Sequence, residues 1–369
     1  MKRIALFAVA LSACGGKYKA PPSVPSIAMP TGSDLKPFDA TKPGLARPSS
    51  IMMFNGKAYV ALGNYDAGYT VRGPGLLGVL EPTTGKLSTI DLGGTTGKRC
   101  LEPFWIRGDG GKLYVTCTGD AFVSGAGEAL VEVDPATNAV TRSVPAPTSP
   151  SGLAITSSRI WFGDAFSGNV YAIDRASFTI VAGPLPIPCP SGSYTTTSDV
   201  ILVQGDVYAV CSNSTAGILS RLDPVTGKVK MQTDAGPIAA EFTETGDGRI
   251  AIVSGGDNKV RLVTISTSAL TTAVAYTFPS STSTLQDIHA RDQFLFTAAS
   301  GSNTVQKLDL TKSDAQMFVG EANVGSGAAP FNIVPLDDDQ ALVANQSSNT
   351  VVSVSSDCTG GKVCWTTPK

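Results

Sequence analysis

Charge and histidine are both scarce in this sequence. Only 16% of its residues are Asp, Glu, Lys or Arg, with 28 basic and 30 acidic side chains, and there is one histidine. A single histidine excludes reactions that need a histidine pair and metal sites built from several imidazoles. The nearly balanced charge provides no basic surface of the kind that nucleic acids require, so we expect no nucleic-acid partner.

Long hydrophobic runs and helical periodicity are also lacking. The apolar run from Ile4 to Leu11 is too short to span a bilayer, because a transmembrane helix needs about 20 apolar residues. After residue 14, no stretch keeps apolar residues at helical spacing over three turns. Instead, 39 Gly and 24 Pro separate short clusters of Val, Ile, Leu and Tyr. This composition is typical of an all-β protein with many turns.

One phrase recurs seven times along the chain. Each copy has a polar residue, then alternating apolar residues, then Gly, Ser or Asn, and this pattern predicts a short strand followed by a tight turn. The copies are KAYVALGN from Lys57, KLYVTCTG from Lys112, RIWFGDAF from Arg159, DVYAVCSN from Asp206, RIAIVSGG from Arg249, QFLFTAAS from Gln293 and QALVANQS from Gln340. A regular repeat indicates a fold built from copies of one unit.

The segments around each phrase complete a unit of four antiparallel strands. An apolar segment, often introduced by proline as at Pro103, Pro150 and Pro330, precedes the phrase. A third strand and a hairpin follow it, commonly through an Asp-Pro-x-Thr-Gly turn. Seven such units predict a seven-bladed β-propeller. Because the last unit has a fourth strand in 362–367, we predict that the ring closes without a strand from the N-terminus.

The repeats resemble those of YVTN-type β-propellers. The resemblance is carried by Tyr114-Val115-Thr116, by Ala-Ser-Gly-Ser-Asn-Thr-Val from Ala299 and by Val-Ala-Asn-Gln-Ser-Ser-Asn-Thr-Val up to Val351, and it covers residues 48–369. It implies blades arranged around a central axis, with the first strand of each blade innermost. It implies no single function, since surface-layer proteins, periplasmic binding proteins and enzymes share this repeat.

The N-terminus carries a second resemblance. Lys2 and Arg3 precede the apolar run, which ends in Leu11-Ser12-Ala13-Cys14-Gly15. This resembles the lipobox of bacterial lipoproteins, and it implies a signal peptide over residues 1–13 and a lipidated Cys14 that carries palmitate-type acyl chains. The alternative is an ordinary secretory signal with a cysteine after Ala13 by chance.

The predicted domain organisation follows from these features. Residues 14–47 hold the lipidated cysteine and a proline-rich tether, with prolines at 21, 22, 25, 30, 37 and 43, and residues 48–369 form the propeller. We expect attachment to a membrane in the bacterial cell envelope through the N-terminal lipid. The resemblance to bacterial lipoproteins implies that retention in the inner membrane would be marked by an Asp directly after the lipidated cysteine. Gly15 stands at this position, which favours the outer membrane.

Six cysteines remain after Cys14, an even number that favours disulfides in an exported chain. Cys117 and Cys211 occupy the same position in their repeats, and each has one cysteine just upstream. The repeat register therefore predicts the pairs Cys100–Cys117, Cys189–Cys211 and Cys358–Cys364. We expect no metal site and no cofactor.

The predicted binding surface lies where two repeats depart from the common length. The connection from the second to the third strand is longer in the first two repeats than in the other five. Long loops on a rigid scaffold commonly carry recognition. The candidate binding residues are Tyr65, Asp66, Tyr69, Arg72, Asp120 and Phe122. We predict a monomeric, non-catalytic binding platform for an envelope protein, a glycan or a small ligand.

Two alternatives stay open. A lactonase-like or other hydrolytic propeller would use a channel site near Asp287 and His289, which share one face of a strand and are spaced as an acid/base pair. Glu102, Arg107 and Glu241 are further channel candidates. A structural component of a surface layer is the second alternative. Trp105, Trp161 and Trp365 are expected to be packing residues.

Overall fold

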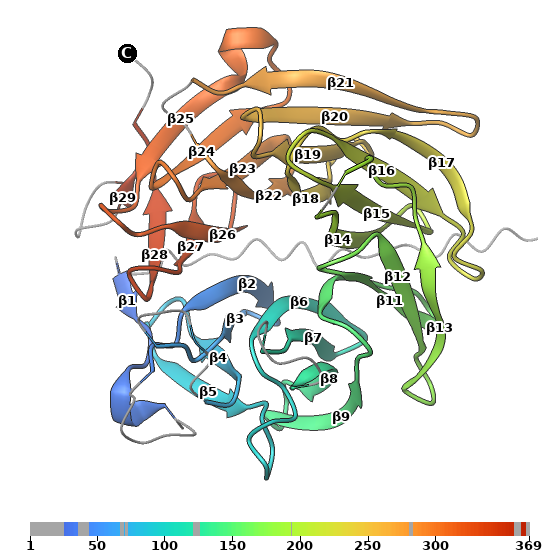
Figure 1. The fold of residues 1–369 in the computed structure, drawn as a ribbon. Helices are drawn as coiled ribbons and strands as arrows, with labels where there is room; N and C mark the ends of the chain where they lie inside the picture. The colour runs from blue at the N-terminus through green and yellow to red at the C-terminus, as the bar shows by residue number, and fades with distance from the viewer. Residues whose placement is uncertain are drawn as a thin grey trace, which may run out of the picture.

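The computed structural model describes residues 26–35, 44–66, 70, 73–120, 126–192, 194–279, 283–357 and 363–366. Seven sheets of four antiparallel strands, one of which is joined by a fifth, parallel strand, are arranged around a central axis, so the protein is an all-β, seven-bladed propeller, as predicted (Figure 1). Among these residues, no helix has the length and apolar character needed to cross a membrane. The predictions for Cys14, Tyr69, Arg72, Phe122 and Cys358 lie outside the described residues.

Blades 1 to 4 follow one another along the chain, and the strands of each run from the axis outward. Their strands are β2 (Pro48–Phe54), β3 (Lys57–Leu62), β4 (Leu76–Leu80), β5 (Leu87–Asp91); β6 (Pro103–Asp109), β7 (Lys112–Thr118), β8 (Glu128–Asp134), β9 (Ala139–Pro145); β10 (Pro150–Ile155), β11 (Arg159–Asp164), β12 (Asn169–Asp174), β13 (Thr179–Pro186); and β14 (Thr196–Val203), β15 (Asp206–Ser212), β16 (Gly217–Leu222), β17 (Val229–Asp234).

Blades 5 to 7 complete the ring, together with one strand from the N-terminal segment. Their elements are β18 (Ala239–Glu244), β19 (Ile250–Ser254), β20 (Lys259–Ile265), β21 (Leu270–Thr277); β22 (Leu285–Arg291), β23 (Phe294–Ala299), β24 (Thr304–Asp309), β25 (Phe318–Asn323); and β26 (Pro330–Pro335), β27 (Ala341–Asn345), β28 (Thr350–Ser355), β29 (Val363–Cys364), β1 (Ser26–Ala28). Two short 3-10 helices are η1 (Gly32–Asp34) and η2 (Asp314–Met317).

The recurring phrase forms the second strand of every blade. Each of these strands begins within one residue of the position predicted from the repeat. Alternation along them places apolar side chains on both faces, where each face meets a neighbouring blade. Seven apolar clusters result, and each joins two adjacent blades: Tyr59 and Leu77 of blade 1 pack with Ile106 and Val115 of blade 2, for example. The propeller therefore has a core distributed around the ring.

Ring closure differs from the prediction. The N-terminal strand β1 pairs antiparallel with β28, with Ser26 opposite Val352 and Ala28 opposite Thr350. The C-terminal strand β29 also pairs with β28, but it runs parallel to it and meets it further along, at Val354 and Ser355. The prediction that blade 7 supplies all four of its own strands is wrong, because 363–364 are too few and run in the wrong direction to form the antiparallel edge.

The segment expected to be a tether is partly folded onto the ring. Ile27, Met29 and Leu35 are buried in the cluster between blades 7 and 1, beside Val334 and Leu342. Main-chain hydrogen bonds join Gly32 to Gly44 and Leu45 to Tyr65. Residues 26–35 and 44–47 therefore belong to the propeller, and the folded part begins before residue 48.

Two of the predicted disulfides are present. Cys100 is bonded to Cys117 and Cys189 to Cys211, over sequence separations of 17 and 22 residues. Each ties the connection that enters a blade to the second strand of that blade. The third predicted pair includes Cys358, which lies outside the described residues.

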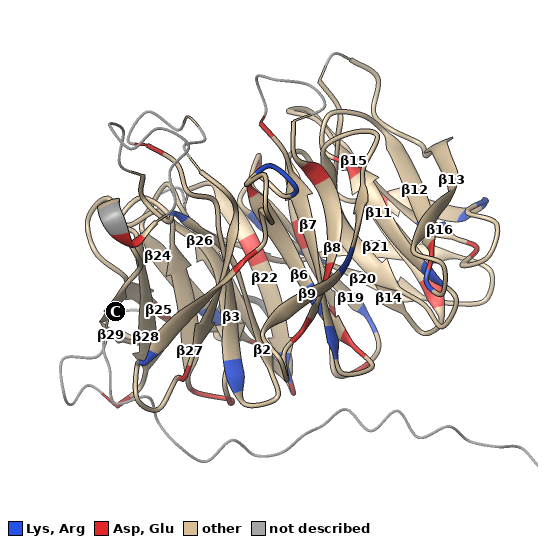
Figure 2. Cartoon of the chain, turned by 90° about the horizontal axis from the view of Figure 1, so that it is seen from below, with Lys and Arg blue, Asp and Glu red and all other residues tan. Residues whose placement is uncertain are grey.

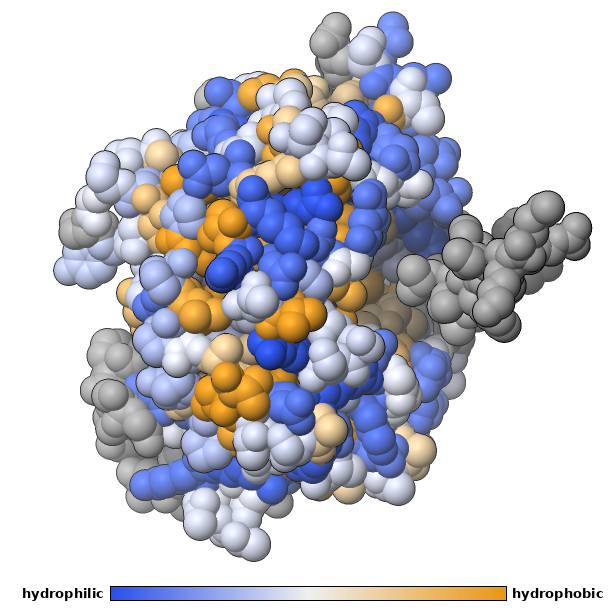
Figure 3. All heavy atoms as spheres, turned by 90° about the vertical axis from the view of Figure 1, so that its right-hand side faces the viewer, coloured by the Kyte–Doolittle hydropathy of each residue, from blue (hydrophilic) through white to orange (hydrophobic). Residues whose placement is uncertain are grey.

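Charged residues are sparse on the propeller. Figure 2 shows this edge-on, with Lys and Arg scattered among Asp and Glu and no basic face on the visible side. Large exposed apolar residues on the outer strands include Ile180, Val181 and Val229. On the side shown in Figure 3, apolar groups are small and separated by hydrophilic residues. The rim seen there offers no continuous apolar docking surface.

Candidate functional site

Every innermost strand has a register shift near its start, at the same level of the channel. In each blade, the residue two positions after the start of this shift belongs to a layer that we call the channel belt. Its members, in blade order, are Ser50, Trp105, Gly152, Asp199, Glu241, Asp287 and Asn332. Bulges re-aim side chains next to functional sites, and here they gather three carboxyl groups at the axis.

One arginine partly balances these carboxyl groups. Arg107 Nη2 lies 3.5 Å from Asp199 Oδ2 and 3.7 Å from Glu241 Oε1. The amide of Asn332 donates a hydrogen bond of 3.4 Å to Glu241 Oε2. Glu241 is almost completely buried, and its carboxyl group also lies within hydrogen-bonding reach of that of Asp287.

Asp287 and Asn332 also connect neighbouring blades. Asp287 Oδ2 accepts a hydrogen bond of 2.6 Å from the backbone N–H of Ile333 in blade 7, and its Oδ1 accepts one of 2.8 Å from Ile288. In the same way, Asn332 Oδ1 accepts a hydrogen bond of 2.8 Å from the backbone N–H of Ile51 in blade 1. Both residues satisfy backbone groups inside the ring, which is an architectural role.

Burial dominates the titration of the belt. It raises the pKa of Asp199 to about 7, and the nearby charge of Arg107 opposes this shift. It raises the pKa of Asp287 to about 6 and that of Glu241 well above its usual range, with repulsion from Asp287 adding to the shift of Glu241. Burial lowers the pKa of His289 to about 4. Burial therefore favours the protonated form of all three carboxyl groups, while His289 is neutral near neutral pH.

The predicted pair of Asp287 and His289 is brought together, with His289 Nε2 3.6 Å from Asp287 Oδ1. Glu241, Asp287 and His289 offer ligand atoms within 4.8 Å of one another, the only such group of three among the described residues. However, both oxygens of Asp287 already accept backbone hydrogen bonds, and Arg107 supplies positive charge beside Glu241. We therefore interpret this group as a charge cluster of the scaffold.

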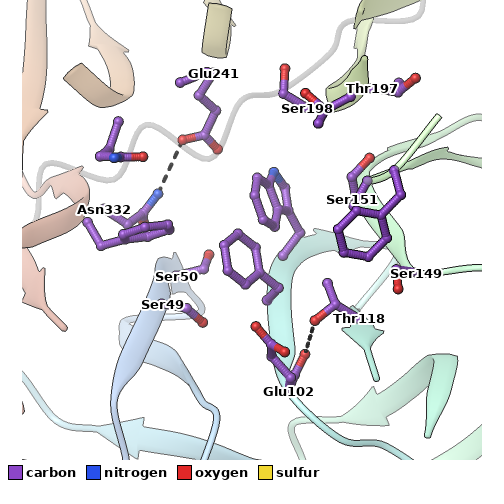
Figure 4. A pocket seen from close by; sticks show the side chains of 18 residues that line it. Ser49, Ser50, Glu102, Thr118, Ser149, Ser151, Thr197, Ser198, Glu241 and Asn332 are labelled. Carbon is purple, nitrogen blue, oxygen red and sulfur yellow. Dashed lines mark hydrogen bonds between the residues drawn. The ribbon is translucent and has the colours of Figure 1, made fainter. Parts of the chain in front are cut away.

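Above the belt, on the face where the chain enters each blade, lies a cavity of about 310 Å³ (Figure 4). Phe104 and Trp105 stack in it with ring centroids 4.0 Å apart, and Phe331 meets Phe104 edge-on at 5.3 Å. Phe166 adds an exposed ring at the mouth. Hydroxyl groups surround these rings, from Ser49, Ser50, Thr118, Ser149, Ser151, Thr196, Thr197 and Ser198.

A second cavity of about 480 Å³ opens on the opposite face of the ring. His289 and Arg107 line this cavity and not the aromatic one, whereas Glu241 borders both. Asp287 is completely buried between them. The predicted acid/base pair therefore has its open side away from the aromatic pocket.

The described ends of the two enlarged loops lie near Glu102 on the wall of the aromatic pocket. Tyr65, predicted as an exposed contact residue, is only 8% exposed, and its hydroxyl is hydrogen-bonded to Glu102 at the pocket wall. Burial raises the pKa of both groups. Asp66 closes the base of its loop through a hydrogen bond of 2.9 Å from the N–H of Thr70. Asp120 lies near Glu102 and Tyr65, where its charge raises their pKa.

Several pocket residues were missed or misread from the sequence. Trp105 was expected to pack in a blade, as Trp161 does, but it is only half-buried and lines the pocket. Asp199, Asn332 and the phenylalanines at 104 and 331 were not singled out. The innermost strands of the seven blades share a common start, which is often a proline. An alignment on this start would have placed these pocket and belt residues in two neighbouring layers.

No family model matches the sequence, and no curated protein matches it. Solved structures are similar in fold: a streptogramin B lyase has 16% identity and a TM-score of 0.64, with 84% of this chain and 93% of that chain covered. Virginiamycin B lyase from Staphylococcus aureus has 16% identity and a TM-score of 0.62, with 84% and 96% covered. A putative 6-phosphogluconolactonase from Bacteroides fragilis has 13% identity and a TM-score of 0.62, with 85% and 95% covered. At these identities, the likeness shows the fold alone.

Proposed function

We propose that this propeller binds a small organic ligand in the aromatic pocket on the axis, without chemical conversion. One observation carries the proposal: a concave site lined by Phe104, Trp105 and Phe331 stands directly above buried polar groups. A cavity of about 310 Å³ has the size and mixed lining typical of small-molecule sites. The hydroxyl of Ser151, which is 2% exposed, has no hydrogen-bond partner among the described residues, and a ligand would supply one.

The proposal predicts that Trp105→Ala weakens binding of any ligand of this pocket at least tenfold, about 1.4 kcal/mol, because it removes the largest ring in the wall. Binding is measured by calorimetry on hits from a fragment screen. Trp365→Ala is the matched control, since Trp365 is half-buried in contact with Phe296 at the rim of the ring. Equal affinity of both variants would refute the pocket. Turnover of a bound lactone would favour the enzyme alternative instead.

We also propose that the chain is a lipoprotein of the bacterial cell envelope, on the strength of the sequence around Cys14. The expected result is that the mature protein made in a bacterial host enters the detergent phase on phase separation, and that Cys14→Ser leaves it in the aqueous phase, because the acyl chains provide the membrane affinity. Aqueous partitioning of both forms would favour the ordinary secretory signal.

A further inference from the structure

The charge of the aromatic pocket is of one sign. Its described lining contains two ionisable residues, Glu102 and Glu241, and no Lys, Arg or His. Arg107, which partly balances the belt, lines the opposite cavity and is directed at Asp199 and Glu241. A ligand in the aromatic pocket therefore meets carboxyl groups without meeting a positive side chain of the protein.

The two carboxyl groups lie on different sides of the aromatic rings. Figure 4 shows Glu241 entering from the side of β18 and Glu102 from the opposite side, at the end of the connection to β6. Glu241 is 6% exposed, and burial raises the pKa of both groups. Burial disfavours the ionised form of each carboxyl group, whereas a positive charge placed between them favours it, so a bound cation is attracted by both groups as they ionise.

The rings add a second attraction for a cation. An ammonium group close to the face of an aromatic ring is attracted by the negative charge of that face, most strongly over tryptophan, and the attraction grows as water is excluded. Phe104, Trp105 and Phe331 provide three rings within one cavity. An anion would instead meet two carboxyl groups and the negative faces of these rings.

We propose that the ligand of the aromatic pocket carries an organic cation, a protonated amine or quaternary ammonium group attached to a compact apolar body. This inference rests on the proposed function and specifies its ligand class. The apolar body lies against Phe104 and Phe331, the ammonium group lies between Glu102 and Glu241, and the Ser and Thr hydroxyls accept its N–H groups where it has them. Phosphorylated and carboxylic ligands are excluded by the same charges.

The test uses three probes of similar size at pH 7: phenethylamine, which is a cation, 2-phenylethanol, which is neutral, and phenylacetate, which is an anion. Calorimetry and saturation-transfer NMR measure their binding to the whole protein. We expect the amine to bind at least tenfold more tightly than the alcohol, and phenylacetate not to bind. Glu241→Gln should remove about tenfold of the amine's affinity and leave that of the alcohol unchanged.

Glu244→Gln is the matched control, because Glu244 lies on the same strand but lines the opposite cavity. It should leave the binding of all three probes unchanged. If the alcohol binds as tightly as the amine, the cation inference is overturned and small-ligand binding stands. If none of the three probes binds to the folded protein, the proposed function is overturned as well.

Discussion

Replacing Asn349 by alanine is expected to lower the free energy of unfolding by about 4 kcal/mol, because this side chain fastens the N-terminal segment to the last blade. Its amide donates hydrogen bonds of 3.0 Å to Met29 O and 3.2 Å to Pro30 O, and its Oδ1 accepts one of 2.7 Å from the N–H of Arg47. Asn349 is 7% exposed, so water does not replace these partners freely.

The backbone of Asn349 adds to the expected loss. Its φ is 54°, a left-handed conformation that alanine adopts at a cost of about 1 kcal/mol and glycine adopts readily. Asn349→Gly therefore separates the hydrogen bonds from the backbone strain. Chemical denaturation gives the free energies, and hydrogen exchange at Ser26–Ala28 reports whether β1 detaches.

Asn303 provides the matched control for this prediction. It occupies the same turn in blade 6, has φ 58°, and its Oδ1 accepts a hydrogen bond of 3.0 Å from the N–H of Ala329 at the start of the next blade. Among the described residues, no hydrogen bond joins the Asn303 side chain to the N-terminal segment, whereas Asn349 makes three such bonds. Asn303→Ala should cost less and leave exchange at β1 unchanged. Equal losses in both variants would contradict a fastening role of Asn349.

The repeat explains why the architecture could be predicted and its closure could not. The positions of the strands and turns and the number of blades follow from two features of each repeat. These are the alternation of apolar residues and the presence of turn residues such as Asn303. Closure instead pairs residues such as Ser26 and Val352, which lie far apart in the sequence and belong to no repeat. A three-residue strand inside a proline-containing segment gives no local signal, so the tether prediction extended too far.

The site was predictable only in part, for a related reason. The enlarged loops could be recognised because loop length is visible against a regular repeat, and Tyr65 and Asp120, at their described ends, lie near Glu102 on the pocket wall. The burial of individual side chains was not visible in the sequence. Tyr65 is turned inward onto Glu102, and the raised pKa of Asp199 comes mainly from its burial inside the ring. The chemistry at the axis arises from residues that are adjacent only after the ring has closed.

Replacing Asp287 by alanine is expected to destabilise the fold by about 3 kcal/mol at pH 5, because two buried backbone N–H groups, those of Ile288 and Ile333, lose their acceptor. The penalty should decrease as pH rises from about 4 to about 6 and change little above that range. The folded pKa of Asp287, about 6, is above its unfolded value, so ionisation weakens the wild-type fold as pH rises through this window, and the variant escapes that loss. Urea denaturation at several pH values measures both effects.

Two further variants identify the cause of this effect. Asn332→Ala removes the equivalent acceptor, for Ile51, without removing an ionisable group, so its penalty should vary less with pH. His289→Ala should cost about 1 kcal/mol or less, since His289 is partly exposed and its closest carboxylate contact is 3.6 Å. A stable Asp287→Ala protein would contradict the architectural role. If Asp287→Ala is unstable while His289→Ala folds normally, Asp287 stabilises the ring and His289 does not. Loss of an activity in Asp287→Ala alone is then explained by unfolding, and it is no evidence for an acid/base pair.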